Sequence, residues 1–184
     1  MASMLVMTII GPDRPGLVDA VATIVGEYGG NWLESRMSRL GGQFAGILRV
    51  EAPAGQESRL VSALKQLESR GLTIVAHPDP AEAAPGPVRL SVLEILGQDR
   101  PGIVHQISRA LARAGVNIEE LHTECASAAM TGETLFKARA RLSLPPLCDV
   151  ARLRRELEQI GADLIVDVSL ADLEEPGQRP LSPS

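Results

Sequence analysis

The feature that most constrains the fold of this chain is an internal repeat. The segment GPDRPGLV at residues 11–18 recurs as GQDRPGIV at residues 97–104. The match continues past this loop at the same spacing, because Asn31 corresponds to Asn117. A register shared by a loop, a helix-length segment and the start of a strand indicates two copies of one module.

The composition is that of a globular protein, with 45% hydrophobic and 22% charged residues. Its 184 residues suffice for the two small domains that the repeat requires. A net charge of −5 and a pI near 5.3 argue against a surface that neutralises phosphates. Aromatic residues, at 2%, are too few to stack nucleic-acid bases. We therefore expect no direct contact with nucleic acid.

The two cysteines and the amino-terminal segment predict the compartment. Cys125 and Cys148 fall in separate elements, so we expect small buried hydrophobic residues in a reducing environment rather than a disulfide. The apolar segment 5–10 is too short to span a membrane and no basic stretch precedes it. These features predict a cytoplasmic protein that does not contact a membrane.

Each copy shows the same order of elements: strand, helix, strand, strand, helix, strand. The hydrophobic periods and the turn residues define the ranges. Asp13 is expected to cap the first helix, with Pro15 in its first turn. The first copy predicts strands at 4–10, 31–40, 44–52 and 72–76, and helices from about 13 to 28 and 56 to 70. The second predicts strands at 88–96, 117–126, 134–144 and 163–170, and helices at 101–114 and 149–160.

This order predicts an α+β fold of two ferredoxin-like βαββαβ modules, each a four-stranded antiparallel sheet with two helices on one face. The predicted domains are a first module at 1–77, a proline- and alanine-rich linker at 78–87, a second module at 88–170 and a disordered tail at 171–184. The open sheet face of the second module carries a basic row of Lys137, Arg139 and Arg141. This row is either solvated or paired with an acidic residue such as Glu94. Open faces and edges also make a homodimer possible.

The sequence contains no recognisable catalytic set and no metal-ligand spacing. His122 and Cys125 lie close together on one strand, but alternation sends them to opposite faces. The glycines of the repeated loop lack the spacing and the lysine of a phosphate-binding loop. We expect neither enzymatic activity nor a cofactor.

The repeated loop is the strongest candidate site. A strand that feeds a helix through Gly-x-Asp-Arg-Pro-Gly places unpaired N–H groups and the positive end of the helix dipole together, which favours a carboxylate. Asp13 and Asp99 could receive an ammonium group beside it, so the loop suits the two ends of a free amino acid. Asn31 and Asn117 are expected on the same edge of the module. The alternative is that the loop serves only as a helix cap and a tight turn.

The loop motif, the following Gly-x-Asn and the order of elements resemble the ACT domains, a family of small-molecule-binding regulatory domains. The resemblance covers residues 4–76 and 88–170 and implies an amino-acid ligand at an interface between two modules, held by this loop and the start of the second strand. Ten residues are implicated. They are Asp13, Arg14, Pro15, Gly16, Asn31, Asp99, Arg100, Pro101, Gly102 and Asn117.

A pair of such modules without an attached enzyme is similar to the glycine cleavage system transcriptional repressor group, whose members are thought to bind a transcription activator rather than DNA. The resemblance implies a non-enzymatic amino-acid sensor that modulates a regulatory protein partner. The alternatives are a detached regulatory subunit of an amino-acid-metabolic enzyme and an assembly module without a ligand. The copies differ, since Gln98 replaces Pro12 and His122 replaces Arg36, so the two loops need not share a ligand.

Overall fold

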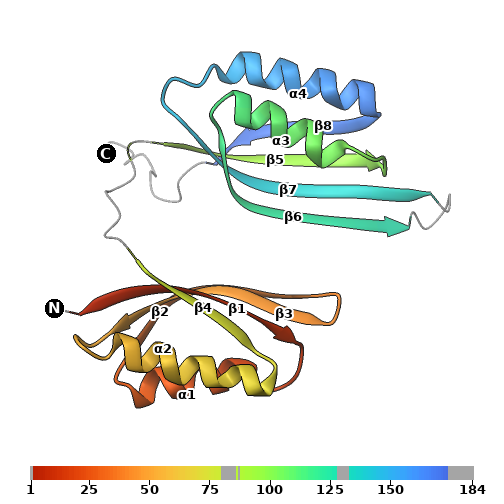
Figure 1. The fold of residues 1–184 in the computed structure, drawn as a ribbon. Coiled ribbons are helices and arrows are strands. Elements are labelled where there is room, and N and C mark those ends of the chain that lie inside the picture. The colour runs from red at the N-terminus through yellow and green to blue at the C-terminus, as the bar shows by residue number, and fades with distance from the viewer. Residues whose placement is uncertain (1, 80–85, 87, 128–132, 174–184) are drawn as a thin grey trace, which may run out of the picture. The chain divides into compact units, whose positions relative to one another are not determined.

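The computed structural model describes residues 2–79, 86, 88–127 and 133–173. The chain divides into two compact units, residues 1–84 and 85–184. Figure 1 shows that each unit consists of one sheet with helices on one of its faces. The predicted α+β class, with two ferredoxin-like modules, is confirmed.

The first unit forms a sheet in the order β2-β3-β1-β4, in which every neighbouring pair is antiparallel. Gly41 and Gly42 form the two-residue β2–β3 turn, and both have positive φ, which is the geometry that a twisted hairpin favours. The elements are β1 (Ser3–Pro12), α1 (Leu17–Glu27), β2 (Asn31–Leu40), β3 (Gln43–Ala52), α2 (Glu57–Lys65), η1 (Gln66–Arg70) and β4 (Thr73–Pro78).

The second unit repeats this topology with the order β6-β7-β5-β8. Its neighbouring strands are antiparallel as well. Residues 128–132, between the strands predicted at 117–126 and 134–144, lie outside the described residues. The elements are β5 (Arg89–Gln98), α3 (Ile103–Arg113), β6 (Asn117–Ser127), β7 (Thr134–Leu144), α4 (Val150–Leu164) and β8 (Val166–Asp172).

The core of each unit lies between its sheet and its helices. Alternate residues of β1 are buried, and α1 buries residues at a spacing of four, which puts them on one face. The first core includes Leu5, Met7, Ile9, Leu17, Val21, Val25, Leu48, Leu60 and Leu64. The second core is built from the corresponding positions, among them Leu93, Ile95, Ile103, Ile107, Leu111, Leu142, Leu153 and Leu157.

The open sheet faces of the two units differ in chemistry. In the first unit Ile10, Ile47 and Val75 stand on the face away from the helices and are 50%, 55% and 45% exposed. Thr8 lies between Ile47 and Val75 in the strand register. The centre of this face, around Thr8, is therefore apolar, whereas Arg49 lies on the same face beside Val6 in the register.

The open face of the second unit is charged. The predicted basic row of β7 alternates with the buried residues of that strand, and each cation has an acidic partner. Of the two alternatives left open by the sequence, pairing with Glu94 is present. The pairs are Lys137–Glu124 at 3.5 Å, Arg139–Glu94 at 3.6 Å and Arg141–Glu119 at 3.0 Å.

Several boundaries differ from the prediction. The helix expected at 56–70 is α-helical only to Lys65 and continues as the 3-10 helix η1. The helix α4 continues to Leu164, four residues beyond its predicted end. The strand β4 reaches Pro78 and β8 reaches Asp172, so regular structure extends past the predicted starts of the linker and of the tail. Residues 80–85 and 87 of the linker and 174–184 of the tail lie outside the described residues.

The prediction that both cysteines are buried is wrong for Cys125, which is exposed, while Cys148 is half-buried. Cys125 belongs to β6, an edge strand that is exposed along nearly its whole length. Both thiols are free. The helices cover the centre of the sheet and leave its edge strand uncovered, which periodicity alone does not reveal.

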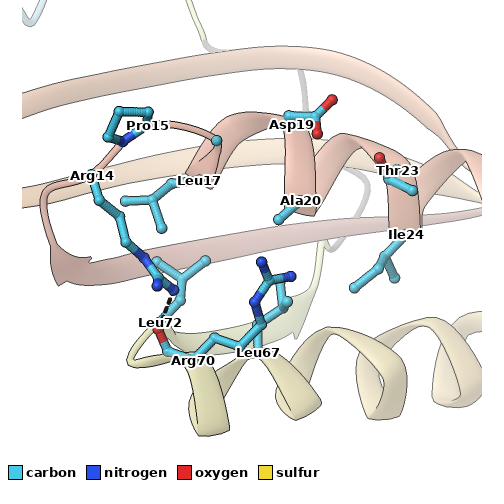
Figure 2. Close-up of a pocket in the computed structure, with 11 residues that line it drawn as sticks. Arg14, Pro15, Leu17, Asp19, Ala20, Thr23, Ile24, Leu67, Arg70 and Leu72 are labelled. Carbon is cyan, nitrogen blue, oxygen red and sulfur yellow. Dashed lines mark hydrogen bonds between the residues drawn. The ribbon is translucent and has the colours of Figure 1, made fainter.

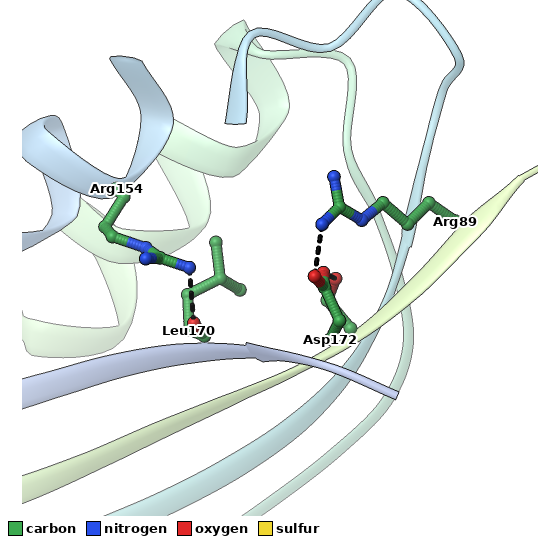
Figure 3. Close-up of polar contacts among 5 residues, drawn as sticks. Arg89, Arg154, Leu170 and Asp172 are labelled. Atoms are coloured by element: carbon green, nitrogen blue, oxygen red, sulfur yellow. Dashed lines mark hydrogen bonds and ion pairs between the residues drawn. The ribbon is translucent and has the colours of Figure 1, made fainter. Parts of the chain in front are cut away.

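Three polar contacts join the end of β8 to β5 and to α4 (Figure 3). Arg89 of β5 donates to the carboxylate of Asp172. Ser91, a fully buried residue, donates to the same carboxylate at 3.2 Å. Arg154 of α4 donates to the carbonyl oxygen of Leu170 at 3.0 Å. The hydrogen bond from Arg89 is the main reason that the pKa of Asp172 lies below its ordinary value.

This contact predicts a small acid sensitivity of the second unit. Because the pKa of Asp172 is lowered in the folded state, its stabilisation is present above the ordinary aspartate value and is lost as the pH falls through the folded value. We expect Asp172→Asn to lower stability at pH 6 by less than about 1 kcal/mol, since the pair is half-exposed. The difference from the wild type should shrink as the pH is lowered through the folded pKa of Asp172. Urea unfolding followed by circular dichroism at a series of acidic pH values measures it, and a difference that does not shrink as the pH falls would contradict the assignment.

Candidate functional site

The repeated loop turns the chain from a central strand into a helix by means of a left-handed glycine. Gly16 and Gly102 have φ of 88° and 95° and directly precede Leu17 and Ile103, the first residues of α1 and α3. Only glycine adopts this backbone readily. This geometry accounts for the last glycine of the motif in both copies.

The prediction that Asp13 caps the first helix is wrong. Neither α1 nor α3 has a side-chain cap, because Gly16 and Gly102 occupy the capping position. Pro15 precedes that glycine, so it is not the first residue of the helix. The first hydrogen bond of α1 runs from the amide of Ala20 to the carbonyl of Gly16, at 3.0 Å. The amides of residues 17–19 have no acceptor within the helix. This is the arrangement that the predicted carboxylate site requires.

The two loop aspartates differ in their surroundings. The Asp13 carboxylate accepts from Arg39 Nε at 2.6 Å, so a cation already lies against it. In the second copy Cys125 stands at the position of Arg39, and Asp99 has no ion-pair partner among the residues that the structure describes. The backbone role is shared: the amide of Asp13 donates to Gly42 and that of Asp99 to Thr134, both at 2.9 Å.

The two loop arginines differ as well. Arg14 donates to the carbonyl oxygen of Arg70, at the end of η1, and so joins the loop to the second helical segment. Arg100 instead donates to the side chain of Gln98 within its own loop, at 3.2 Å. The departure of Gln98 from Pro12 therefore changes what the loop arginine contacts.

A groove of about 390 Å³ opens beside the first loop, between α1 and the end of the second helical segment. Figure 2 shows Arg14 reaching across from the loop and the Arg70 guanidinium lying between the two helical segments. The polar residues of the lining are Arg14, Asp19, Thr23 and Arg70, and the others are Pro15, Gly16, Leu17, Ala20, Ile24, Leu67 and Leu72. Asp13 does not line it.

The expectation that Asn31 and Asn117 lie on the same edge as the loop is wrong within one module. Asn31 pairs with Glu51, which faces Met4 at the start of β1, whereas the loop follows the other end of β1. Asn117 pairs with Ser143, which faces Leu90 at the start of β5. The helix between loop and asparagine runs the length of the sheet, so it separates the two. The asparagines and the loop of one module do not form one site.

Sequence reasoning missed Asp19, Thr23 and Arg70 as lining residues of the groove. Asp19 and Thr23 are spaced by four along α1 and therefore share a face of the helix, which is a signal that the sequence contains. No local pattern reveals Arg70, because only the packing of the second helical segment against α1 brings it to the loop.

The first glycine of the motif allows the end of the first strand to lie close to the backbone that leads into the fourth strand of the module. A Cβ added at Gly11 would lie 2.4 Å from the carbonyl oxygen of Gly71, and one added at Gly97 would lie 2.6 Å from Cα of Val166. Both neighbours are backbone atoms: Gly71 lies between η1 and β4, and Val166 is the first residue of β8. Gly16 differs, since a Cβ there would meet nothing within 4 Å.

Among the described residues no three side chains of histidine, cysteine, aspartate or glutamate gather in a way that could hold a metal ion. His122 faces Arg139 in the register and Cys125 faces Phe136, which places them on opposite sides of the sheet as predicted. Within the described part of the chain, no helix has the length and apolar character needed to cross a membrane.

Comparison with known proteins identifies the modules. Models of the ACT domain match residues 3–77 and residues 91–136. The UPF0237 protein MK1213 of Methanopyrus kandleri is 35% identical over 82 residues, which make up 42% of this chain and 81% of that protein.

Solved structures cover nearly the whole chain. A protein of unknown function from Galdieria sulphuraria is similar with a TM-score of 0.85 and 30% identity, over 95% of this chain and 100% of that one. A structure described as a candidate glycine cleavage system transcriptional repressor gives 0.68 and 19% identity, over 95% and 99% of the two chains. At this identity the second likeness shows the fold alone. The chain therefore belongs to the ACT-domain family, with two ACT domains in tandem.

Proposed function

We propose that this protein is a non-enzymatic, cytoplasmic sensor that binds a small amino acid at the loop after the first strand of a module and thereby modulates a regulatory protein partner. The observation that carries the proposal is the groove of about 390 Å³ beside the first loop, a volume in the range of small-molecule sites. It offers cationic side chains, an aspartate and a helix start without a side-chain cap. These groups suit the carboxylate and the ammonium of an amino acid.

The likeness to the candidate glycine cleavage repressor suggests the kind of partner. That protein is named for control of transcription, and the acidic pI of this chain favours contact with a regulator over contact with DNA. Arg14, Pro15 and Gly16, with Arg100, Pro101 and Gly102, are the loop residues that we propose for ligand binding. Asp13 and Asp99 support the loop through their backbone amides.

Thermal unfolding of the full chain against the twenty amino acids tests the proposal. A ligand that binds only the folded state raises the midpoint, and we expect at least one amino acid at 10 mM to raise it by a few degrees. Arg14→Gln or Arg100→Gln should then reduce that shift. No shift with any amino acid would contradict the sensor proposal, and a shift that neither variant changes would contradict the location at the loop.

The main alternative is a detached regulatory subunit of an amino-acid-metabolic enzyme. Affinity capture of the chain with and without its ligand separates the two. Ligand-dependent recovery of a transcription regulator supports the proposal, whereas recovery of a metabolic enzyme supports the alternative. An assembly module without a ligand would show no amino-acid effect in either experiment.

A further inference from the structure

The groove of the first module is lined by more positive than negative side chains. The groove is lined by two guanidinium groups, of Arg14 and Arg70, and by one carboxylate, that of Asp19. Among the described residues Arg70 has no ion-pair partner, and its backbone carbonyl, not its side chain, accepts from Arg14. Arg14 uses one donor of its Nη2 in that contact and retains others. The groove therefore presents two cationic positions and one anionic position.

The corresponding surface of the second module lacks this set. The repeat places His105 at the position of Asp19 and Arg109 at that of Thr23. The left-handed residues Gly71 and Ile165 mark the same point after the second helical segment, so Leu164 takes the position of Arg70. Both the carboxylate and the second guanidinium are thus replaced. Among the described residues, the two-to-one arrangement is present in the first module and not at the equivalent positions of the second.

We propose that the groove of the first module binds an acidic amino acid, with its two carboxylates at Arg14 and Arg70 and its ammonium group at Asp19. This inference rests on the proposed sensor function and names its ligand class. An acidic amino acid carries two carboxylates and one ammonium, which matches the side-chain charges of the groove one for one. A neutral amino acid leaves one guanidinium without a partner, and charge-assisted hydrogen bonds contribute most to affinity at such a site.

The test measures the dissociation constants of the full chain for L-glutamate, L-aspartate, glycine, L-serine and glutarate by calorimetric titration at constant ionic strength. We expect glutamate or aspartate to bind at least about tenfold more tightly than glycine or serine, since each added charge-assisted contact contributes about one tenfold step. Glutarate, which lacks the ammonium group, should bind more weakly than glutamate.

Two variants locate the contacts. Arg70→Gln should weaken glutamate binding about tenfold and leave the Arg14 contact in place, because that contact uses the backbone of Arg70. Asp19→Asn should remove the preference for glutamate over glutarate. Arg59→Gln, at an exposed arginine of α2 that does not line the groove, is the matched control and should change neither constant. Arg100→Gln reports whether the loop of the second module contributes to binding. The unliganded melting midpoint of each variant verifies that it is folded.

The outcomes separate this inference from the sensor proposal. Binding of glycine or serine without a preference for the acidic amino acids overturns the inference and leaves the sensor standing. Equal binding of glutamate and glutarate overturns the role of Asp19. Loss of binding in Arg100→Gln but not in Arg70→Gln moves the site to the second module and overturns the inference too. The absence of binding by any amino acid overturns both.

Discussion

Gly11→Ala is expected to destabilise the first module by about 2–3 kcal/mol, as overpacking of a well-packed site does. The added Cβ would lie 2.4 Å from the carbonyl oxygen of Gly71 and 3.2 Å from Cα of Leu72. These are backbone atoms between η1 and β4, and no rotamer change can move them. The strands β1 and β4 must separate to admit the methyl group, so the hydrogen bonds between them weaken.

The single tryptophan of the chain, Trp32, makes this measurable, because it packs against the core of the first module. Urea unfolding followed by its fluorescence reports on that module. Gly16→Ala is the matched control: it meets no atom within 4 Å and costs only the left-handed backbone, about 1 kcal/mol. A loss for Gly11→Ala no larger than that for Gly16→Ala would contradict the steric explanation.

Gly97→Ala extends the prediction to the second module. Its Cβ would lie 2.6 Å from Cα and 2.7 Å from Cγ1 of Val166. We expect a loss of similar size in circular dichroism, with the Trp32 transition unchanged, since the tryptophan belongs to the other unit. A shift of the Trp32 transition would show that the two units unfold together.

Ile165→Gly is expected to stabilise the second module by about 1 kcal/mol. Ile165 has φ of 58° at the end of α4, in a left-handed conformation that costs a β-branched residue about 1–2 kcal/mol. Its side chain is 61% exposed, so little packing is lost. Part of the gain is offset because glycine has more freedom in the unfolded chain. Urea unfolding followed by circular dichroism measures the change.

The first module supplies the reverse substitution. Gly71 occupies the same point with φ of 80°, and Gly71→Ala should cost about 1 kcal/mol in the Trp32 transition. A loss of stability in Ile165→Gly would mean that the packing of the isoleucine outweighs its backbone strain. No loss in Gly71→Ala would mean that the left-handed conformation is not required there.

Much of the fold follows from local patterns in the sequence. The alternation of buried residues along β1 and β7, the spacing of four in α1 and the two-glycine turn at Gly41 are determined within a few residues, and each was predictable. The extent of α4 was not, because a left-handed isoleucine ends it and that conformation is rare for a β-branched side chain. The exposure of Cys125 depends on how far the helices reach across the sheet, which is a tertiary property.

The candidate site was predictable only in part. The motif located the loop in both copies, but it did not show that Gly16, and not Asp13, precedes the helix. The pairing of Asp13 with Arg39 joins the loop to the far end of the β2–β3 hairpin, and the contact of Arg14 with Arg70 joins it to η1. Such contacts link distant parts of the chain, so they follow from packing and not from spacing in the sequence.

The unlike open faces of the two sheets have a consequence for how solution conditions act on the protein. Apolar burial strengthens in the presence of excluded salts such as sulfate, whereas attraction between exposed charges weakens as ionic strength rises. Burial of Ile10, Ile47 and Val75 against any apolar surface would therefore strengthen in sulfate, while the ion pairs of the β7 row loosen. The duplicated sheets would thus respond to the same salt in opposite directions.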